Sequence, residues 1–260
     1  MIRRSRLLTS LALISLWALA TLAQAEIAQK GDVRVTISGE LSPKRLPRAG
    51  QAPIAVSVGG QISTTDQSPP PRLQSMKIEL NRAGKIDYTG LPLCPYGAIQ
   101  TASSQRALSA CRGALVGRGS FDAEITLAGQ APYPISGKLL AFNGKSKGKP
   151  VLFGQIYAAN PFATSFVIVF AIGKAAKGSY GTELSATLPK ALGTWGKLTG
   201  IELKLSRHYS YRGKSHSYLS AGCPAPKGIS QVSFPLARAS FDFEGGKVLS
   251  SVLERSCRAG

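Results

Sequence analysis

Apolar and polar residues alternate with a period of two through most of the chain beyond residue 32. In the first such run, Val33, Val35 and Ile37 alternate with polar side chains. The alternation recurs at residues 54–58, 76–80, 121–127, 184–188, 201–205 and 241–243, followed by an apolar stretch at 248–253. Successive side chains of a strand point to opposite faces, so short alternating runs bounded by Gly, Pro, Asn or Ser predict half-buried strands.

Turn residues separate several of these runs. Arg82-Ala83-Gly84-Lys85 predicts a hairpin between residues 76–80 and 86–88, and Gly245-Gly246 predicts another near the C-terminus. Asn143-Gly144 begins a basic loop that ends at Pro150.

One stretch departs from the alternation. Residues 99–115 are rich in Ala, Gln, Arg and Leu, and they contain no Gly or Pro before Gly113. This composition predicts a short helix near 103–111, around Ser103–Cys111. Together with 28 Gly and 16 Pro, the pattern predicts an all-β fold. We expect an antiparallel β-sandwich, or a partly open barrel, of about ten strands.

The first 25 residues have the layout of a secretory signal peptide. Arg3, Arg4 and Arg6 precede an apolar stretch, and Ala23-Gln24-Ala25 forms a cleavage site. Cleavage after Ala25 leaves 235 residues, 26–260, which we expect to form a single disulfide-bonded all-β domain. The Pro-rich segment at residues 61–71 is interpreted as a long loop within that domain. We therefore expect a secreted, extracellular or cell-envelope protein.

All four cysteines lie in the mature part of the chain: Cys94, Cys111, Cys223 and Cys257. An even number in an exported chain predicts disulfides, and four cysteines allow three pairings. We favour Cys94–Cys111 and Cys223–Cys257, because each pair brackets a segment whose ends can return together. No C-x2-C pair exists, and no metal site is expected.

Charge is the strongest bias in the composition. The net charge is +19, and removal of the three signal-peptide arginines lowers it to +16. Such a surface attracts polyanions, and it also confers solubility. No transmembrane segment is expected after signal cleavage, because the best candidate, residues 162–172, is about half of the roughly 20 residues that a spanning helix needs.

Two motifs resemble catalytic motifs, but the residues around each of them do not suit an active site. Asp122 and Glu124 lie two residues apart on one predicted strand, as do Asp242 and Glu244 on another, and such carboxylates usually solvate an outer face. Residues 144–148 match G-x-S-x-G, but a strand-like segment follows where a nucleophile elbow needs a helix. We interpret them as a basic surface loop and assign no catalytic residue.

The segment from residue 204 to 218 is the best candidate for binding. It contains both histidines, three tyrosines and several cations. On an extended strand, Arg207, Tyr209 and Tyr211 would share one face, and His208, Ser210 and Arg212 the other. Aromatic rings beside cations suit sugars and polyanions, whereas a packed strand-turn-strand with a solvated basic rim is the alternative. The candidate binding residues are Arg207, His208, Tyr209, Tyr211, Arg212, Lys214 and His216.

Several short motifs resemble a known family. Residues 90–94, 107–111 and 114–119 do so in order, followed by residues 139–145, Ala221-Gly222-Cys223-Pro224 and Cys257. From about residue 30 onward, the chain resembles a family of secreted, cysteine-paired, β-rich actinobacterial proteins of unknown function. The resemblance implies secretion and paired cysteines, and it transfers no activity or site.

These observations favour a non-catalytic exported protein over an enzyme. We expect it to bind an anionic glycan or a cell-envelope polymer through basic loops, and we expect neither a cofactor nor a nucleic-acid partner. The alternative is a secreted hydrolase that acts on polysaccharide, with an acid pair assembled from different strands.

Overall fold

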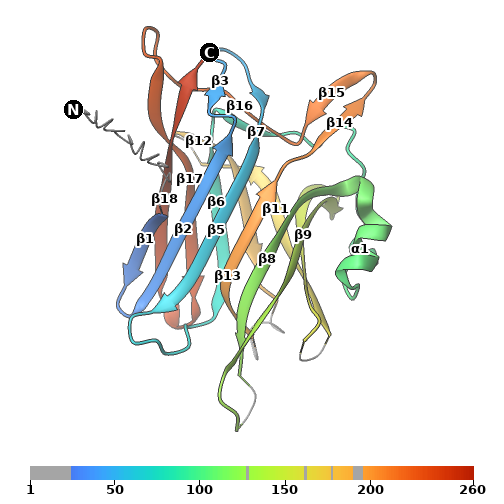
Figure 1. Ribbon diagram of the computed structural model, residues 1–260, viewed down its shortest axis with the longest axis vertical. Helices are drawn as coiled ribbons and strands as arrows, with labels where there is room; N and C mark the ends of the chain where they lie inside the picture. Colours follow the sequence, from blue (N-terminus) through green and yellow to red (C-terminus); the bar gives the residue numbers. More distant parts are fainter. Residues whose placement is uncertain (1–24, 127–128, 161–162, 177, 190–195) are drawn as a thin grey trace, which may run out of the picture.

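The computed structural model describes residues 25–126, 129–160, 163–176, 178–189 and 196–260. These residues form an all-β structure with one short α-helix, as predicted (Figure 1). The strands are β1 (Ala25–Lys30), β2 (Val33–Ser42), β3 (Arg45–Leu46), β4 (Ala52–Pro53), β5 (Ala55–Thr64), β6 (Leu73–Asn81), β7 (Gly84–Ile86), β8 (Leu115–Ile125), β9 (Tyr133–Ser146), β10 (Lys149–Ala158), β11 (Thr164–Lys174), β12 (Tyr180–Thr187), β13 (Gly196–Leu205), β14 (His208–Tyr211), β15 (Lys214–Ser217), β16 (Leu219–Ala221), β17 (Gln231–Phe243) and β18 (Val248–Ala259). The helical elements are η1 (Tyr96–Ala98), α1 (Ser104–Cys111), η2 (Arg112–Ala114) and η3 (Glu244–Gly246).

Thirteen of these strands join one sheet in the order β1-β2-β5-β13-β8-β9-β10-β11-β12-β6-β17-β18-β3. Every neighbouring pair is antiparallel except β18 and β3, which are parallel. The sheet is continuous and curled. It therefore resembles the partly open barrel, which was the second of the two predicted forms, more than a sandwich of two sheets. Two small sheets, β14–β15 and β4–β16–β7, lie at one end of it (Figure 1).

The curl brings the N-terminal edge of the sheet against β18. Arg255 on β18 forms an ion pair with Glu26 on β1 at 2.7 Å, and its Nε donates to the carbonyl of Gly39 on β2. Lys247 pairs with Asp32 in the turn between β1 and β2. Side chains therefore hold this seam, which we call the β1–β18 seam.

The inner face of the sheet carries two apolar clusters. One includes Val33, Phe121, Ile156 and Phe243, and the other includes Leu41, Leu152, Tyr218 and Phe234. All eight side chains are buried, so the burial of the inner face stabilises the curled sheet.

A third cluster lies on the outer face of β9, β10 and β11. Ile99 and Ala107 of the helical segment pack there with Phe142 and Phe153. Because this segment covers the sheet from outside, residues 139–144 of β9 and 151–156 of β10 are buried on both faces and show no alternation. The alternation of apolar and polar residues therefore predicted β9 and β10 least well. The strands β3, β4, β7 and β16 are too short to show an alternation at all. Hence about ten strands were predicted where the described residues contain eighteen.

The predicted helix is confirmed. Ser103 caps its N-terminus by accepting a hydrogen bond from the backbone N–H of Arg106 at 3.3 Å. The helix ends at Cys111, which is bonded to Cys94.

Of the two predicted hairpins, one is wrong. Asn81 accepts a hydrogen bond from the backbone N–H of Ala83 at 2.8 Å and donates to the carbonyl of Pro235. These bonds direct the chain away from β6, and β7 pairs with β16 instead. The second prediction is confirmed: β17 and β18 pair through the turn that contains Gly245 and Gly246, both with positive φ.

Both favoured disulfides are present. The cysteines of the first, Cys94 and Cys111, are 17 residues apart, and those of the second, Cys223 and Cys257, are 34 apart. Two disulfides fit an extracellular protein. No helix in the described ranges has the length and apolar composition needed to cross a membrane. Residues 1–24 of the predicted signal peptide, and Phe162 of the apolar stretch 162–172, lie outside the described residues.

We expect Cys223→Ala/Cys257→Ala to destabilise the protein more than Cys94→Ala/Cys111→Ala. The chain-entropy estimate is about 4 kcal/mol for the 34-residue separation and about 3 kcal/mol for the 17-residue separation. Urea denaturation of the two double variants at equal pH measures both losses. A smaller loss for the Cys223–Cys257 pair would show that loop length does not decide the ranking.

Candidate functional site

The predicted binding segment folds as the β14–β15 hairpin, at the end of the molecule beside α1 (Figure 1). Its two-residue turn consists of Arg212 and Gly213, with φ of 50° and 72°. Two successive positive φ values are those of a type I′ turn, whose twist suits a tight hairpin. The turn places Tyr209 opposite His216 and Tyr211 opposite Lys214.

The aromatic side chains of the hairpin gather on one face, as the alternation predicted. Tyr209 stacks on His216 with ring centroids 5.4 Å apart, and Tyr211 meets the same imidazole edge-on at 6.1 Å. The side chains of His208 and Ser210 lie on the opposite, exposed face.

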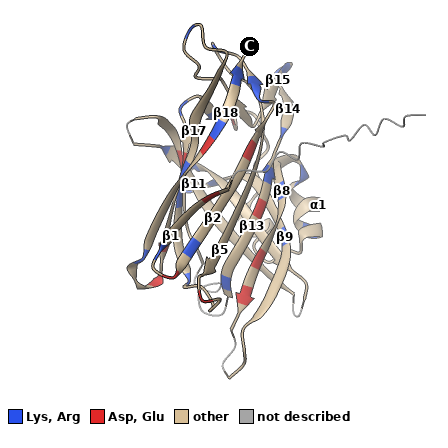
Figure 2. Ribbon diagram, turned by 60° about the vertical axis from the view of Figure 1, so that its left-hand side comes forward, with Lys and Arg blue, Asp and Glu red and all other residues tan. Residues whose placement is uncertain are grey.

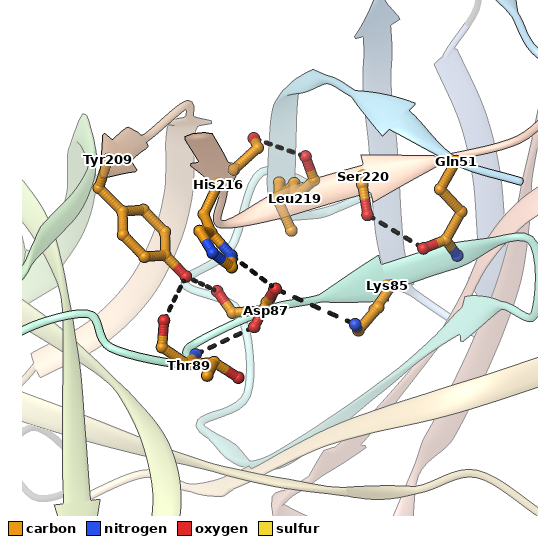
Figure 3. Close-up of polar contacts among 9 residues, drawn as sticks. Gln51, Lys85, Asp87, Thr89, Tyr209, His216, Leu219 and Ser220 are labelled. Atoms are coloured by element: carbon orange, nitrogen blue, oxygen red, sulfur yellow. Dashed lines mark hydrogen bonds and ion pairs between the residues drawn. The ribbon is translucent and has the colours of Figure 1, made fainter. Parts of the chain in front are cut away.

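The aromatic face packs against the chain that follows β7 (Figure 3). The Tyr209 hydroxyl lies 3.0 Å from the carbonyl of Thr89 and 3.2 Å from that of Asp87, to both of which it can donate. The His216 Nδ1 lies 3.4 Å from the Asp87 carboxylate, and the Lys85 Nζ is 4.0 Å from the same oxygen. The hairpin is therefore docked through a small polar cluster centred on Asp87.

Electrostatics in this cluster favour an ionised Asp87. Partial burial raises the pKa of its carboxyl, but hydrogen bonds from Thr89 and His216 and the charge of Lys85 outweigh burial and hold that pKa below its usual range. Burial, followed by the nearby Asp87 charge, raises the pKa of Tyr209. Tyr209 is thus a neutral hydrogen-bond donor, and Asp87 is an acceptor.

Tyr211 docks on Gly90. A Cβ built on Gly90 would lie 2.2 Å from the Tyr211 ring, and Gly90 has a φ of +73°. Only glycine meets both conditions without strain. Three predicted binding residues, Tyr209, Tyr211 and His216, therefore contact the protein's own chain. This is the packed strand-turn-strand that the sequence analysis gave as the alternative to a binding face.

Of the remaining predicted binding residues, one contacts the protein's own backbone and three are exposed to solvent. Arg207 is half-buried and donates to the carbonyl of Gly113 at 3.4 Å. His208, Arg212 and Lys214 are exposed at the tip and outer face of the hairpin. The Arg212 guanidinium lies 5.2 Å from the centroid of the Tyr211 ring.

The prediction of a basic loop from Asn143 to Pro150 is wrong, because β9 extends to Ser146 and β10 begins at Lys149. The G-x-S-x-G stretch is instead the tip of a second hairpin, between β9 and β10. Lys147 and Gly148, with φ of 48° and 78°, form its two-residue turn, and Ser146 pairs with Lys149. Strands flank the turn on both sides, so a nucleophile elbow is excluded. Lys145, Lys147 and Lys149 are exposed there.

The segment from Asp87 to Tyr96 joins the β14–β15 hairpin to the β9–β10 hairpin. It is bonded to β14 through Thr89, and Asn143 at the end of β9 donates to the carbonyl of Pro92 at 3.0 Å. The backbone N–H of Cys94 donates to the carbonyl of Asn143 at 2.9 Å. The sequence analysis did not identify the exposed apolar and aromatic residues of this segment, because apolar and polar residues do not alternate in the segment. They are Tyr88, Leu93 and Tyr96, with exposed fractions of 41%, 54% and 40%.

We call this part of the molecule the basic end. It comprises the exposed cations Lys145, Lys147, Lys149, Arg212 and Lys214, together with exposed His208, Tyr88, Leu93 and Tyr96. Asp87, already paired with Lys85 and His216, is the one carboxylate in the segments that build it, because residues 88–121, 125–182 and 203–241 contain no Asp or Glu. Figure 2 shows other acidic positions along the strands of the main sheet.

The two carboxylate pairs do not meet. Asp122 and Glu124 lie on β8, and Asp242 and Glu244 lie at the end of β17, with five strands between β8 and β17 in the sheet. Asp242 accepts a hydrogen bond from Ser75, and Glu244 pairs with Arg72 at 3.2 Å. Within the described residues, no group of His, Cys, Asp and Glu could hold a metal ion.

Comparison with models of protein families, with curated proteins and with solved structures finds no match in any of the three. The resemblance to the secreted actinobacterial family stays a prediction.

We expect Asp87→Asn to lower the free energy of unfolding at pH 7 by about 1.5–3 kcal/mol, the usual contribution of hydrogen bonds to a charged group. Because the folded protein has the lower pKa, wild-type Asp87 stabilises it above the ordinary Asp pKa of about 3.9 and loses this effect as pH falls through the folded value. The difference between variant and wild type should therefore shrink toward pH 3 in urea denaturation. Glu202→Gln, at an exposed position on β13, is the control. A difference that stays constant with pH would rule out the charge of Asp87 as the cause.

We expect Gly90→Ala to destabilise the protein by about 1–3 kcal/mol, because it adds a clash with Tyr211 to a strained φ. Gly213→Ala is the matched control: its φ is +72°, but its Cβ would meet nothing within 4 Å, so we expect a loss of about 1 kcal/mol. Thermal denaturation compares the two. Equal losses would mean that Tyr211 is not packed against Gly90 in solution.

Proposed function

We propose that the mature chain is an exported, non-catalytic protein that binds an anionic glycan or cell-envelope polymer through its basic end. One observation carries the proposal: two hairpins with exposed cations at their tips are bonded to the same segment, 87–96, whose one carboxylate, Asp87, is already paired. A cluster of one charge sign raises the local concentration of oppositely charged polymer and its rate of association.

The exposed aromatic residues support a glycan as the polymer. Tyr88 and Tyr96 lie on the segment that joins the two hairpins. Aromatic rings provide flat apolar surface for sugar rings, and cations pair with carboxylate or phosphate groups along the chain. The two disulfides and the signal-peptide layout support a location where such polymers are found.

The backbone of the basic end supports binding without large rearrangement. Both hairpins close with two-residue turns, and the segment between them is tied by the Cys94–Cys111 disulfide and by Asn143. A surface whose backbone is already ordered loses less conformational entropy when it binds.

The test is the affinity of the mature chain, residues 26–260, for polygalacturonate at 20–300 mM salt, measured by isothermal calorimetry. We expect binding that weakens steeply with salt. We expect Lys147→Gln/Lys149→Gln and Arg212→Gln/Lys214→Gln each to weaken it by roughly thirtyfold, because each variant removes two cations and each cation near an anionic surface contributes about 1 kcal/mol.

Lys30→Gln/Arg34→Gln is the matched control, since it removes the same charge from the exposed β1–β2 region. If this control weakened binding as much as the hairpin variants, net charge alone would account for binding. Tyr88→Ala/Tyr96→Ala should weaken binding to polygalacturonate but not to polyphosphate, which has no sugar rings. No binding of wild type to polygalacturonate or to isolated cell envelope at low salt would refute the proposal.

A further inference from the structure

The inner face of the sheet lines an apolar cavity of about 100 Å³ that is partly open to solvent. One wall is formed by β2, β5 and β13, and the other by β6, β17 and β18. Its apolar lining includes Ile37, Val58, Ile78, Ile201, Phe241 and Leu253. The polar residues among its lining, Gln61 and Ser251, are uncharged.

The cavity lies between the two apolar clusters of the inner face. Along β2, Val33 and Val35 are buried in one cluster and Leu41 is buried in the other. Ile37, which lies between them on the same face, is only half-buried. Protein interiors are normally close-packed, so the middle of this sheet is unusually empty.

Small residues create the space. Ala237 and Ala239 occupy successive inner positions of β17, where β6 presents Leu80 and Ile78 as their partners. On the facing wall, a Cβ built on Gly60 would be 3.5 Å from Ile201, which is an ordinary van der Waals contact. Position 60 therefore has room for a side chain, and because glycine has none, this volume is unfilled.

We propose that this cavity binds the end of a straight aliphatic chain. Most of the side chains in the lining are aliphatic, and the lining offers no charged partner for a polar ligand. A dry apolar cavity of about 150 Å³ in another protein takes up benzene or xenon, so this cavity has the size for a short chain end. The inference does not depend on the basic end, because no residue of that end lines the cavity.

The test uses n-hexane and benzene dissolved in buffer, with the mature chain labelled at its Ile, Leu and Val methyl groups. We expect hexane to shift the NMR signals of Ile37, Ile78, Ile201 and Leu253 saturably, and benzene to do so more weakly. Exposed Ile27 and Val248 are internal controls for unspecific adsorption. Shifts of these controls alone, no shifts at all, or stronger binding of benzene would overturn the proposal.

Two variants fill the cavity. We expect Ala239→Leu and Gly60→Ala to weaken hexane binding, the former by about tenfold or more, because the added methyl and methylene groups occupy the site. Gly60→Ala guards against failure of Ala239→Leu to fold through overpacking. Ser63→Val, on the exposed face of β5, is the control and should bind hexane as wild type does. Unchanged binding in a folded Ala239→Leu variant would place the hexane elsewhere.

Dihexanoylphosphatidylcholine below its micelle concentration distinguishes the sources of the chain. Shifts of the same four methyl groups would identify the chain of a lipid as a ligand. Shifts with hexane but not with this lipid would identify a free hydrocarbon chain instead.

Discussion

The structure depends on the curl of its thirteen-stranded sheet. A flat sheet of this width would leave the apolar side chains of one face in water, and twisted open sheets of more than about ten strands usually curl or split. Curling buries that face in two clusters and brings β1 and β2 against β18. Arg255 then forms the ion pair with Glu26 and donates to the Gly39 carbonyl across the seam. The positions of both edges, and of the end that carries the hairpins, follow from this curl.

The alternation of apolar and polar residues predicted those strands that have one buried face and one solvent-exposed face. Runs such as Val33–Ile37 and Met76–Leu80 lie in β2 and β6, and the helix capped by Ser103 was also found. Alternation could not predict β9 and β10, because the helical segment covers their outer face and their apolar pattern is continuous. Nor could it show that Asn81 directs the chain away from β6 toward β16.

The candidate site was predicted in part for the same physical reason. Strand periodicity assigned Tyr209 and Tyr211 to one face and His208 to the other. What covers the aromatic face is the segment with Asp87 and Gly90, more than 100 residues earlier in the chain, and no local pattern reveals such a neighbour. Lys145, Lys147 and Lys149 were predicted to lie in a loop, but they lie at the end of a tight hairpin that is bonded through Asn143 to the segment containing Pro92.

The strand order also constrains how the chain folds. Strand β5 pairs with β13, matching Val58 with Leu203, and β6 pairs with β17, matching Ile78 with Ala239. Folding slows as contacting residues become more distant in sequence, so this topology favours slow folding. During synthesis, β2 and β5 can pair early, but one edge of β5 and both edges of β6 stay open until the second half of the chain arrives. Such unpaired edges promote aggregation, so a nascent chain of this fold is exposed to aggregation for longer than a chain of local hairpins.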